Sequence, residues 1–519
     1  MNNASQSRNL LFLAASVAVL AACGAEEISS PGSGGNISIT NNTPAPPPPP
    51  PPVSTLVTPA AGCPTIDDPA GLTDLGTISG PTGTYRNCAL PARITRSSKL
   101  TRVPGLLYSL PGRVDVGTDL GASGGSGVTL TIDPGVTIFG ATGVSWLAVN
   151  RGNRISAVGT ATQPIVFTSR DNVLGLATDD SQGQWGGVVL LGRAPITDCT
   201  VAPNAEPGSV SCERQTEGAT DPAYYGGATP TDNSGTMKYV QIRYSGYVLS
   251  GNSELQALTT GGVGSGTVLE YIQSHNSSDD GLEFFGGTHN MKRLVVTGAD
   301  DDNVDLDTGY RGLIQYVIAV QKTSGNADSM IELDSTNALE NNKPRTWMRI
   351  ANFTMIHRNP ATGNGAAMRF RGGADVSMVN GLLVSPMTCL RLDGANMLTT
   401  DAAIDKVGPP VFKSVAMQCG ATPFAGSSGL TAAQVDAAFN VAGNNNISTF
   451  TNTLTGGFIN GANETARTAT DPKTINAGFD TTTYIGAVKD ANDTWYAGWT
   501  CNSATANFGS TSKSCTSIP

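Results

Sequence analysis

Short apolar segments, separated by glycine, asparagine and aspartate, recur along the chain from about residue 128 onward. Almost none of them shows the 3.6-residue spacing of an amphipathic helix, so we expect them to be β-strands. The first of these segments are 128–132, 146–149, 165–168 and 187–191.

Between about residues 267 and 393 two kinds of strand alternate. One kind is long and apolar, and the other is short with apolar and charged residues in turn. Long strands are expected at 268–272, 294–296, 313–320, 350–356 and 376–384. Short strands are expected at 282–284, 304–307, 331–334, 368–371 and 390–393.

The fixed order of the two strand types predicts an all-β solenoid. Equivalent positions in the short strands recur at intervals of 22 to 37 residues, the length of one coil with insertions in some turns. A β-sandwich is the alternative, but it predicts hairpin turns instead of two alternating strand types. We therefore predict a right-handed parallel β-helix over residues 126–400.

Alternation within the short strands predicts which side chains point outward. Ten apolar residues should face the core: Leu282, Phe284, Val304, Leu306, Ile331, Leu333, Met368, Phe370, Leu390 and Leu392. The positions between them should stack in ladders about 4.8 Å apart. One ladder reads Glu283, Asp305, Glu332, Arg369, Arg391, and its neighbour reads Phe285, Asp307, Asp334, Arg371, Asp393.

The outward face is therefore rich in carboxylates, which makes it a candidate Ca²⁺ site. Hard oxygen ligands at this density suit Ca²⁺, which takes six to eight oxygens. Asp280, Asp302 and Asp328 precede successive short strands and are expected to form a third column. The predicted ligands are Asp280, Glu283, Asp302, Asp305, Asp307, Asp328, Glu332 and Asp334. The alternative is a solvated acidic face whose charges are paired with arginines, with aspartates used in turns.

A catalytic use of the same face is also considered. A polysaccharide lyase would hold Ca²⁺ against a uronate, with Arg369 or Arg371 as the base. A hydrolase would pair carboxylates as acid and base, and the sequence around Asp280 superficially resembles the Asp-Asp motif of polygalacturonases. The companion Gly-His-Gly and Arg-Ile-Lys motifs of that family are missing. We expect a protein that is not an enzyme. If it is an enzyme, Arg369, Arg371 and Asp280 are the candidate catalytic residues.

The first 62 residues predict export and a tether. An apolar run from Leu10 ends in Leu-Ala-Ala before Cys23, which resembles the lipobox of bacterial lipoproteins. Residues 1–22 would be the signal peptide, and Cys23 would be acylated and anchor the protein in the membrane. The alternative is an ordinary signal peptide with an incidental cysteine. Residues 23–62, with seven consecutive prolines at 46–52, would form a stiff linker.

The remaining eight cysteines fall into four local pairs, as expected of an exported protein. None has the Cys-x-x-Cys spacing of a zinc or redox site. Disulfide bonds are expected for Cys63/Cys88, Cys199/Cys212, Cys389/Cys419 and Cys501/Cys515.

The two ends of the solenoid are expected to be capped, because a bare terminal coil exposes an edge. Residues 63–125 would be the N-terminal cap and 401–519 the C-terminal cap region. A short helix is expected over 431–439 with Thr431 near its N-cap. Trp495, Tyr496 and Trp499 offer a candidate stacking surface for sugars.

The charge balance argues against a nucleic-acid partner. The formal net charge is −10 with a pI near 4.9, and charged residues make up only 14% of the chain. An acidic protein of this kind suits cation binding or simple solubility.

Several segments together resemble a family of uncharacterised β-helix surface lipoproteins of Gram-negative bacteria. They are 128–138, 184–192, 275–285, 300–307 and the tail motifs 484–488 and 495–500. The resemblance implies the β-helix fold and a place in the cell envelope, and it brings no catalytic residues. In such bacteria, aspartate after the lipidated cysteine would signal retention, whereas this chain has glycine after Cys23. The protein is therefore expected in the outer membrane, on either of its two faces.

These observations lead to one functional expectation and one alternative. We expect a lipid-anchored envelope protein that acts as a binding or surface-organising module, with Ca²⁺ on the acidic ladder holding a surface glycan or another envelope protein. The alternative is a polysaccharide lyase or glycoside hydrolase that acts on acidic glycans at the same face.

Overall fold

A computed structural model describes residues 56–518, apart from 252, 326, 336–338 and 359–364. The predicted signal peptide, the lipidated Cys23 and the prolines at 46–52 lie outside the described residues. The described residues form one compact unit. Among the residues described, no helix has both the length and the apolar character needed to cross a membrane.

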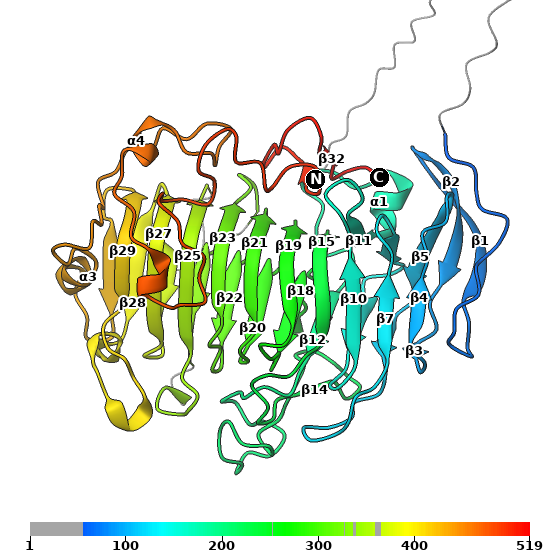
Figure 1. The fold of residues 1–519 in the computed structure, drawn as a ribbon, viewed down its shortest axis with the longest axis horizontal. Coiled ribbons are helices and arrows are strands. Elements are labelled where there is room, and N and C mark those ends of the chain that lie inside the picture. The colour runs from blue at the N-terminus through cyan, green and yellow to red at the C-terminus, as the bar shows by residue number, and fades with distance from the viewer. Residues whose placement is uncertain (1–55, 252, 326, 336–338, 359–364, 519) are drawn as a thin grey trace, which may run out of the picture. The chain divides into compact units, whose positions relative to one another are not determined.

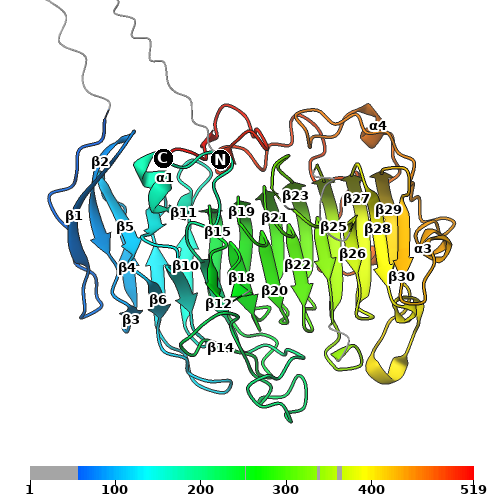
Figure 2. The ribbon, with the colours of Figure 1, turned by 180° about the vertical axis from the view of Figure 1, so that it is seen from behind.

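Two large sheets, built mainly from parallel strands, dominate the described unit (Figures 1 and 2). Consecutive strands alternate between the sheets over most of the chain. Sheet A is 15-stranded and contains β1 (Thr73–Gly80), β2 (Gly83–Ala89), β4 (Ser98–Leu100), β5 (Leu106–Leu110), β7 (Thr129–Ile132), β8 (Thr137–Gly140), β10 (Arg154–Val158), β11 (Ile165–Ser169), β15 (Gly235–Arg243), β19 (Val268–His275), β21 (Asn290–Thr297), β23 (Leu313–Val320), β25 (Trp347–Ile356), β27 (Asp375–Val384) and β29 (Val411–Gln418).

Sheet B is 11-stranded and contains the short strands. Its members are β3 (Arg93–Ile94), β6 (Arg113–Val116), β9 (Trp146–Val149), β12 (Gly187–Leu191), β18 (Leu258–Gly261), β20 (Leu282–Phe285), β22 (Val304–Asp307), β24 (Ile331–Leu333), β26 (Ala366–Phe370), β28 (Thr388–Asp393) and β30 (Phe424–Ser427). With β1–β2 as the one antiparallel pair in these two sheets, this arrangement confirms the predicted right-handed parallel β-helix.

The hydrophobic core lies between the sheets, as the alternation in the short strands predicts. All ten residues expected to face inward belong to one buried cluster, and none is more than 1% exposed. Burial of apolar side chains from every coil is the main stabilising contribution, because a single coil cannot enclose its own apolar side.

The long strands of sheet A bend in the middle, which splits the sheet into two faces. One residue in each strand has a positive φ, and these residues share one register across neighbouring coils. Strand β10 accordingly pairs with the first half of β15, and β11 pairs with its second half. We call these bend residues the corner column: Tyr239, Tyr271, Arg293, Tyr316, Asn352, Asn380 and Ser414.

Residues 440–518, here called the strap, run back along the solenoid (Figures 1 and 2, orange to red). The strap starts beyond α3 (Ala432–Phe439), includes α4 (Ala462–Thr465), and reaches the side of α1 (Arg170–Leu174) with its β31 (Cys501–Asn502) and β32 (Lys513–Ser514). It covers the second halves of the long strands, where Val295, Ile318 and Leu382 pack against strap residues.

The helix predicted at 431–439 is confirmed as α3. Thr431 is its N-cap, and a capping box links Thr431 and Gln434. Val435 and Phe439 bury the inner side of this helix against the last coil.

An insertion between β12 and β15 covers the first part of sheet B. It carries β13 (Arg214–Gln215), β14 (Tyr224–Tyr225) and the disulfide Cys199–Cys212. Its residues pack on Trp146, Val189 and Phe285, which point outward from sheet B. In β22, β26 and β28 the outward ladder positions of sheet B carry charged, partly exposed side chains.

Four disulfide bonds join the cysteine pairs predicted from the sequence. They are Cys63–Cys88, Cys199–Cys212, Cys389–Cys419 and Cys501–Cys515. Each closes a loop of at most 30 residues, so each reinforces one local part of the solenoid or strap.

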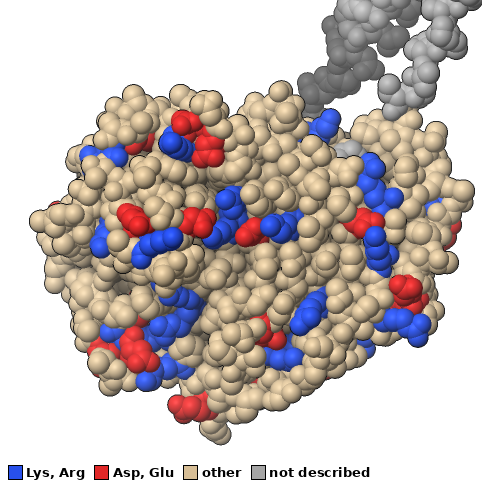
Figure 3. Space-filling model, in the orientation of Figure 1, with Lys and Arg blue, Asp and Glu red and all other residues tan. Residues whose placement is uncertain are grey.

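Acidic and basic side chains are interspersed on the molecular surface seen in Figure 3. Much of that surface is uncharged, and no large patch of one sign is visible on it.

Candidate functional site

The outward ladder predicted for sheet B is present in the strand register. Glu283 pairs in register with Asp305, Asp305 with Glu332, Glu332 with Arg369, and Arg369 with Arg391. Adjacent parallel strands lie about 4.8 Å apart, so each of the three inner members of this ladder has a charged neighbour on either side.

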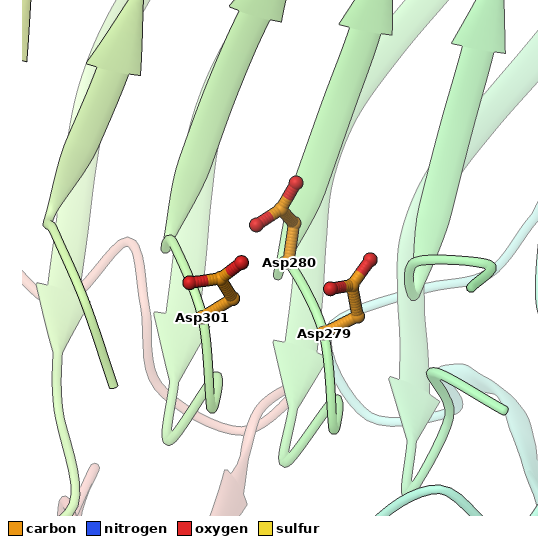
Figure 4. Close-up of side chains that lie close together, drawn as sticks. All are labelled: Asp279, Asp280 and Asp301. Atoms are coloured by element: carbon orange, nitrogen blue, oxygen red, sulfur yellow. The ribbon is translucent and has the colours of Figure 1, made fainter. Parts of the chain in front are cut away.

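Five carboxylates converge at the acidic end of the ladder. Asp279, Asp280 and Asp301 lie side by side on turns of neighbouring coils (Figure 4). Within this group the nearest carboxylate oxygens all lie within 4.8 Å of one another. The same limit holds for a second group of Asp280, Glu283 and Asp305, so Asp280 is shared by both. We call these five residues the acidic cluster.

Backbone contacts fix the turns that carry the cluster. Asp280 Oδ1 accepts a hydrogen bond from the backbone N–H of Asp302 at 2.9 Å, and Asp302 Oδ1 accepts one from Ser329 at 2.6 Å. The column expected to read Asp280, Asp302, Asp328 therefore ends in Ser329, and the prediction is wrong by one residue. Asp328 is instead aligned with Asp301: the backbone N–H of Asp328 donates a hydrogen bond to the carbonyl of Asp301.

Burial and mutual repulsion disfavour ionisation in the acidic cluster. Burial raises the pKa of Asp279 to about 6 and that of Asp301 to about 7. The pKa values of Asp280, Glu283 and Asp305 lie well above the ordinary range, first through burial and then through the neighbouring carboxylates. A bound cation would favour the ionised carboxylates and so counteract both the burial and the mutual repulsion.

One carboxylate oxygen in the cluster has no partner. Glu283 is only 7% exposed, and its Oε2 makes no hydrogen bond to any residue that the structure describes. Leaving a buried charged oxygen unsatisfied is costly, so this atom requires a proton or a ligand.

The donor set and the spacing fit Ca²⁺. Two oxygens that share one Ca²⁺ at about 2.4 Å can be at most about 5 Å apart. The 4.8 Å limit within each group satisfies this condition without movement of the backbone. The cluster contributes carboxylate oxygens alone, the ligand type that Ca²⁺ prefers.

The other half of the ladder is a network of arginines paired with carboxylates. Arg369 contacts Glu332 at 3.1 Å and Asp393 at 2.9 Å. Arg371 contacts Glu332 at 3.2 Å and Asp334 at 3.0 Å, and Arg391 contacts Asp393 at 2.7 Å. A cavity of about 520 Å³ opens over these arginines.

The structure thus divides the eight predicted metal ligands into three sets. Asp280, Glu283 and Asp305 belong to the acidic cluster. Glu332 and Asp334 pair with arginines, as the alternative interpretation of the acidic face expects. The remaining three, Asp302, Asp307 and Asp328, lie outside both groups of converging oxygens.

Two cluster members were missed as ligands by sequence reasoning. Asp279 and Asp301 lie in turns, where strand alternation gives no direction for a side chain. The one sequence feature that could have identified them as ligands is that they belong to the acidic runs 279–280 and 300–302.

The geometry disfavours the candidate base Arg371. Burial alone would lower the pKa of Arg371, but Glu332, Asp334 and nearby carboxylates outweigh burial and raise it. A guanidinium held protonated by two ion pairs is a poor proton acceptor. No histidine is available as a proton acceptor on this face either, because His275, His289 and His357 are all buried.

Two of the three aromatic residues proposed as a sugar platform are buried. Trp499 is fully buried and lies edge-on to Tyr239 and Tyr271 of the corner column, so it anchors the strap to sheet A. Tyr496 is 7% exposed and packs on Phe458 and Phe508 of the strap. The prediction of a stacking surface for sugars is wrong for these two residues, and Trp495 is half-buried beside them.

Comparison with known proteins gives one match. Residues 108–500 match the family model described as a pectate-lyase like beta helix domain. Searches of curated proteins and of solved structures found no match.

Proposed function

The chain belongs to the family of pectate-lyase-like β-helix domains, and within it we propose a Ca²⁺-dependent binding module of the cell envelope. Ca²⁺ would be held by the acidic cluster on sheet B. The ligand would be a surface glycan or another envelope protein that supplies further oxygens to the ion.

The unpartnered Oε2 of Glu283 carries this proposal. Glu283 lies with Asp280 and Asp305 at carboxylate separations that one Ca²⁺ can span, and all five members of the cluster have raised pKa values. A divalent cation satisfies the orphan oxygen and cancels the repulsion at once.

The chain's own residues would leave part of the coordination shell open. Asp280 and Asp305 each direct one oxygen to a backbone N–H, at 2.9 and 2.6 Å, which holds these carboxylates in place. Asp301 is exposed at the solvent side of the cluster. Since Ca²⁺ takes six to eight oxygens, ligand or water oxygens would complete the shell from this side.

The placement of the module follows from the N-terminal segment. We propose that Cys23 carries the lipid, that residues 23–62 space the β-helix from the membrane, and that the protein sits in the outer membrane of a Gram-negative bacterium. The interspersed charges in Figure 3 and the net charge of −10 support a partner other than nucleic acid.

A polysaccharide lyase is the second candidate, because the family's description favours it. A lyase on this face would use Arg369 or Arg371 as base beside a cation near Asp280. The ion pairs of both arginines with carboxylates weigh against that chemistry.

Calorimetric titration of Ca²⁺ into chelator-treated protein tests the proposal. We expect saturable binding that Glu283→Gln weakens by about tenfold or more, because affinity depends on the number of ligand charges. Glu270→Gln makes the same change on sheet A and should leave the affinity unchanged. Absence of binding to the wild type, or equal binding by both variants, would reject the acidic cluster as a Ca²⁺ site.

The same variants separate binding from catalysis. Arg371→Ala should leave Ca²⁺ affinity largely intact. If the wild type cleaves polygalacturonate and Arg371→Ala abolishes the cleavage, the lyase candidate replaces the binding module.

A further inference from the structure

The cavity over the arginines of sheet B has a chemistry different from that of the acidic cluster. Its lining includes Arg369, Arg371, Arg391, Asp393 and Asn396, together with Ser427 and Ser428 of the next coil. Its volume of about 520 Å³ falls within the range of sites for small ligands. Most such sites are lined by apolar groups, whereas this lining is polar apart from Ala395 and the glycines.

The arginines of the cavity are already paired with carboxylates. The three guanidinium groups contact Asp393, which also lines the cavity, and Glu332 and Asp334, which lie next to it. Glu340 adds a further carboxylate to the lining, so these seven groups carry one negative charge in excess. An incoming anionic group would therefore meet no excess of positive charge.

The floor of the cavity is held in a fixed arrangement. Asp393 Oδ1 accepts hydrogen bonds from Arg391 at 2.7 Å and from Ser427 at 2.5 Å, and its Oδ2 accepts one from Arg369 at 2.9 Å. Burial alone would raise the pKa of Asp393, but these three hydrogen bonds outweigh it and lower the pKa. At the rim, Asn396 donates to Glu340 at 2.6 Å.

From this chemistry we infer that the arginine cavity is a subsite for a neutral saccharide, bound through its hydroxyl groups. Each hydroxyl both donates and accepts, which matches a wall of guanidinium donors interleaved with carboxylate and serine oxygens. Among the described residues, the lining contains no aromatic or large apolar group, which argues against a ligand bound through ring stacking or apolar contacts. Because every guanidinium group is paired with a carboxylate and no positive charge is in excess, the cavity does not select for a uronate carboxylate.

This inference rests on the proposed function only in placing the ligand on sheet B, and it does not require the cation. Glu332 separates the cavity from the acidic cluster, being paired in register with Asp305 on one side and with Arg369 on the other. A saccharide that extends from the cavity along the ladder would reach the cluster within two coils.

Binding to an array of neutral hexose oligosaccharides of several stereochemistries, printed beside their uronic counterparts, tests the inference in chelator. We expect at least one neutral saccharide to be bound, with an affinity about tenfold or more above that of its uronic counterpart. Binding confined to uronic saccharides, or binding to none of the array, would overturn the inference.

Two variants locate the subsite and its selectivity. Asp334→Asn removes a carboxylate that pairs with Arg371, while the amide oxygen can still accept from the Ser335 N–H, so it should shift preference toward the uronic counterpart by about tenfold. Adding Arg371→Gln restores the charge balance and should restore the neutral preference. Unchanged selectivity in both variants would overturn the placement, and thermal melting confirms that each variant is folded.

Glu283→Gln separates this inference from the proposed function. It should weaken Ca²⁺ binding by about tenfold or more in calorimetry and leave saccharide binding in chelator unchanged. For the wild type, failure to bind Ca²⁺ with intact saccharide binding rejects the cation site alone, and Ca²⁺ binding without saccharide binding rejects the subsite alone.

Discussion

Carboxylates with raised pKa values make the stability of this protein depend on pH in the absence of a divalent cation. Burial, followed by Asp334, raises the pKa of Asp307 to about 7, against an unfolded value near 3.8. Between those two values the native state holds the proton and the unfolded state does not. Stability therefore falls as the pH rises through this window, since the native state must release protons that the unfolded state has already lost.

The size of the effect follows from the shift. Between pH 5 and pH 7, ionisation of Asp307 alone lowers the free energy of unfolding by about 2 kcal/mol, because the slope of about 1.4 kcal/mol per pH unit is halved where the pH reaches the folded pKa. Asp279, with a pKa of about 6, adds about 1.4 kcal/mol over the same range. The acidic groups interact, so these costs do not add simply. For a unit of this size, a loss of about 3 kcal/mol lowers the melting temperature by roughly 3 °C.

Thermal melting between pH 5 and 7.5, with chelator and with excess Ca²⁺, measures this dependence. In chelator the melting temperature should fall by about 3 °C or more across the range, and Ca²⁺ should reduce the fall because it keeps its ligands ionised. Asp68 and Asp393, whose pKa values are lowered, act only below about pH 4 and leave this window untouched.

A variant and its control identify the groups responsible. Asp307→Asn should flatten the fall in chelator, whereas Asp67→Asn, an exposed aspartate of the N-terminal segment, should not. A melting temperature that is constant or rises with pH in chelator would refute the reasoning. Identical profiles with and without Ca²⁺ would refute the role given to the cation.

The remaining predictions concern packing, and chemical denaturation measures all of them. Trp499→Ala should lower the free energy of unfolding by about 3–5 kcal/mol, because it removes a buried ring that anchors the strap. The control is Val441→Ala, which truncates a half-exposed side chain of the strap and should have a much smaller effect. Leu306→Ala should cost about 2–5 kcal/mol, since this side chain is fully buried in the core. Thr431→Ala should cost about 1 kcal/mol through loss of the capping box of α3. Costs near zero for Trp499 and Leu306 would contradict the packing described above.

The short strands of sheet B could be predicted almost residue by residue. Their alternation is strict, so Leu282 and Phe284 had to face the core and Glu283 had to face outward. Once the strands were aligned, the ladder from Glu283 to Arg391 followed, together with its acidic and basic halves.

The bend in the long strands could not be predicted in the same way. At the corner column the alternation slips by one, so that Glu270 and Tyr271 both point away from the core between the inward-facing Leu269 and Ile272. A positive φ is usually associated with glycine or asparagine, whereas Tyr239, Tyr271 and Arg293 occupy it here. Stacking between Tyr239 and Tyr271, with ring centroids 4.3 Å apart, accompanies this backbone and is a long-range contact.

The course of the strap could not be predicted from the sequence either. Its anchors, such as Phe458 and Trp499, are irregularly spaced and match no helix or strand period. Much of its attachment runs from side chains of the coils to strap backbone, as where the side-chain amide of Gln273 donates to Cys501 O and accepts from Cys501 N–H. Such pairing joins residues 228 positions apart, which no local pattern records.

The path of the strap also bears on how the solenoid comes apart. In a simple repeat protein each coil touches only its neighbours, so the terminal coils can fray one by one. Here Ile447 contacts the last strand of sheet A through Val415, Trp499 rests on the middle coils, and Ile518 packs with Ile78 and Tyr85 of the first hairpin. Opening either end must first peel away a segment that is held along the whole array. The protein should therefore unfold as one cooperative unit, with its first and last coils equally protected from hydrogen exchange.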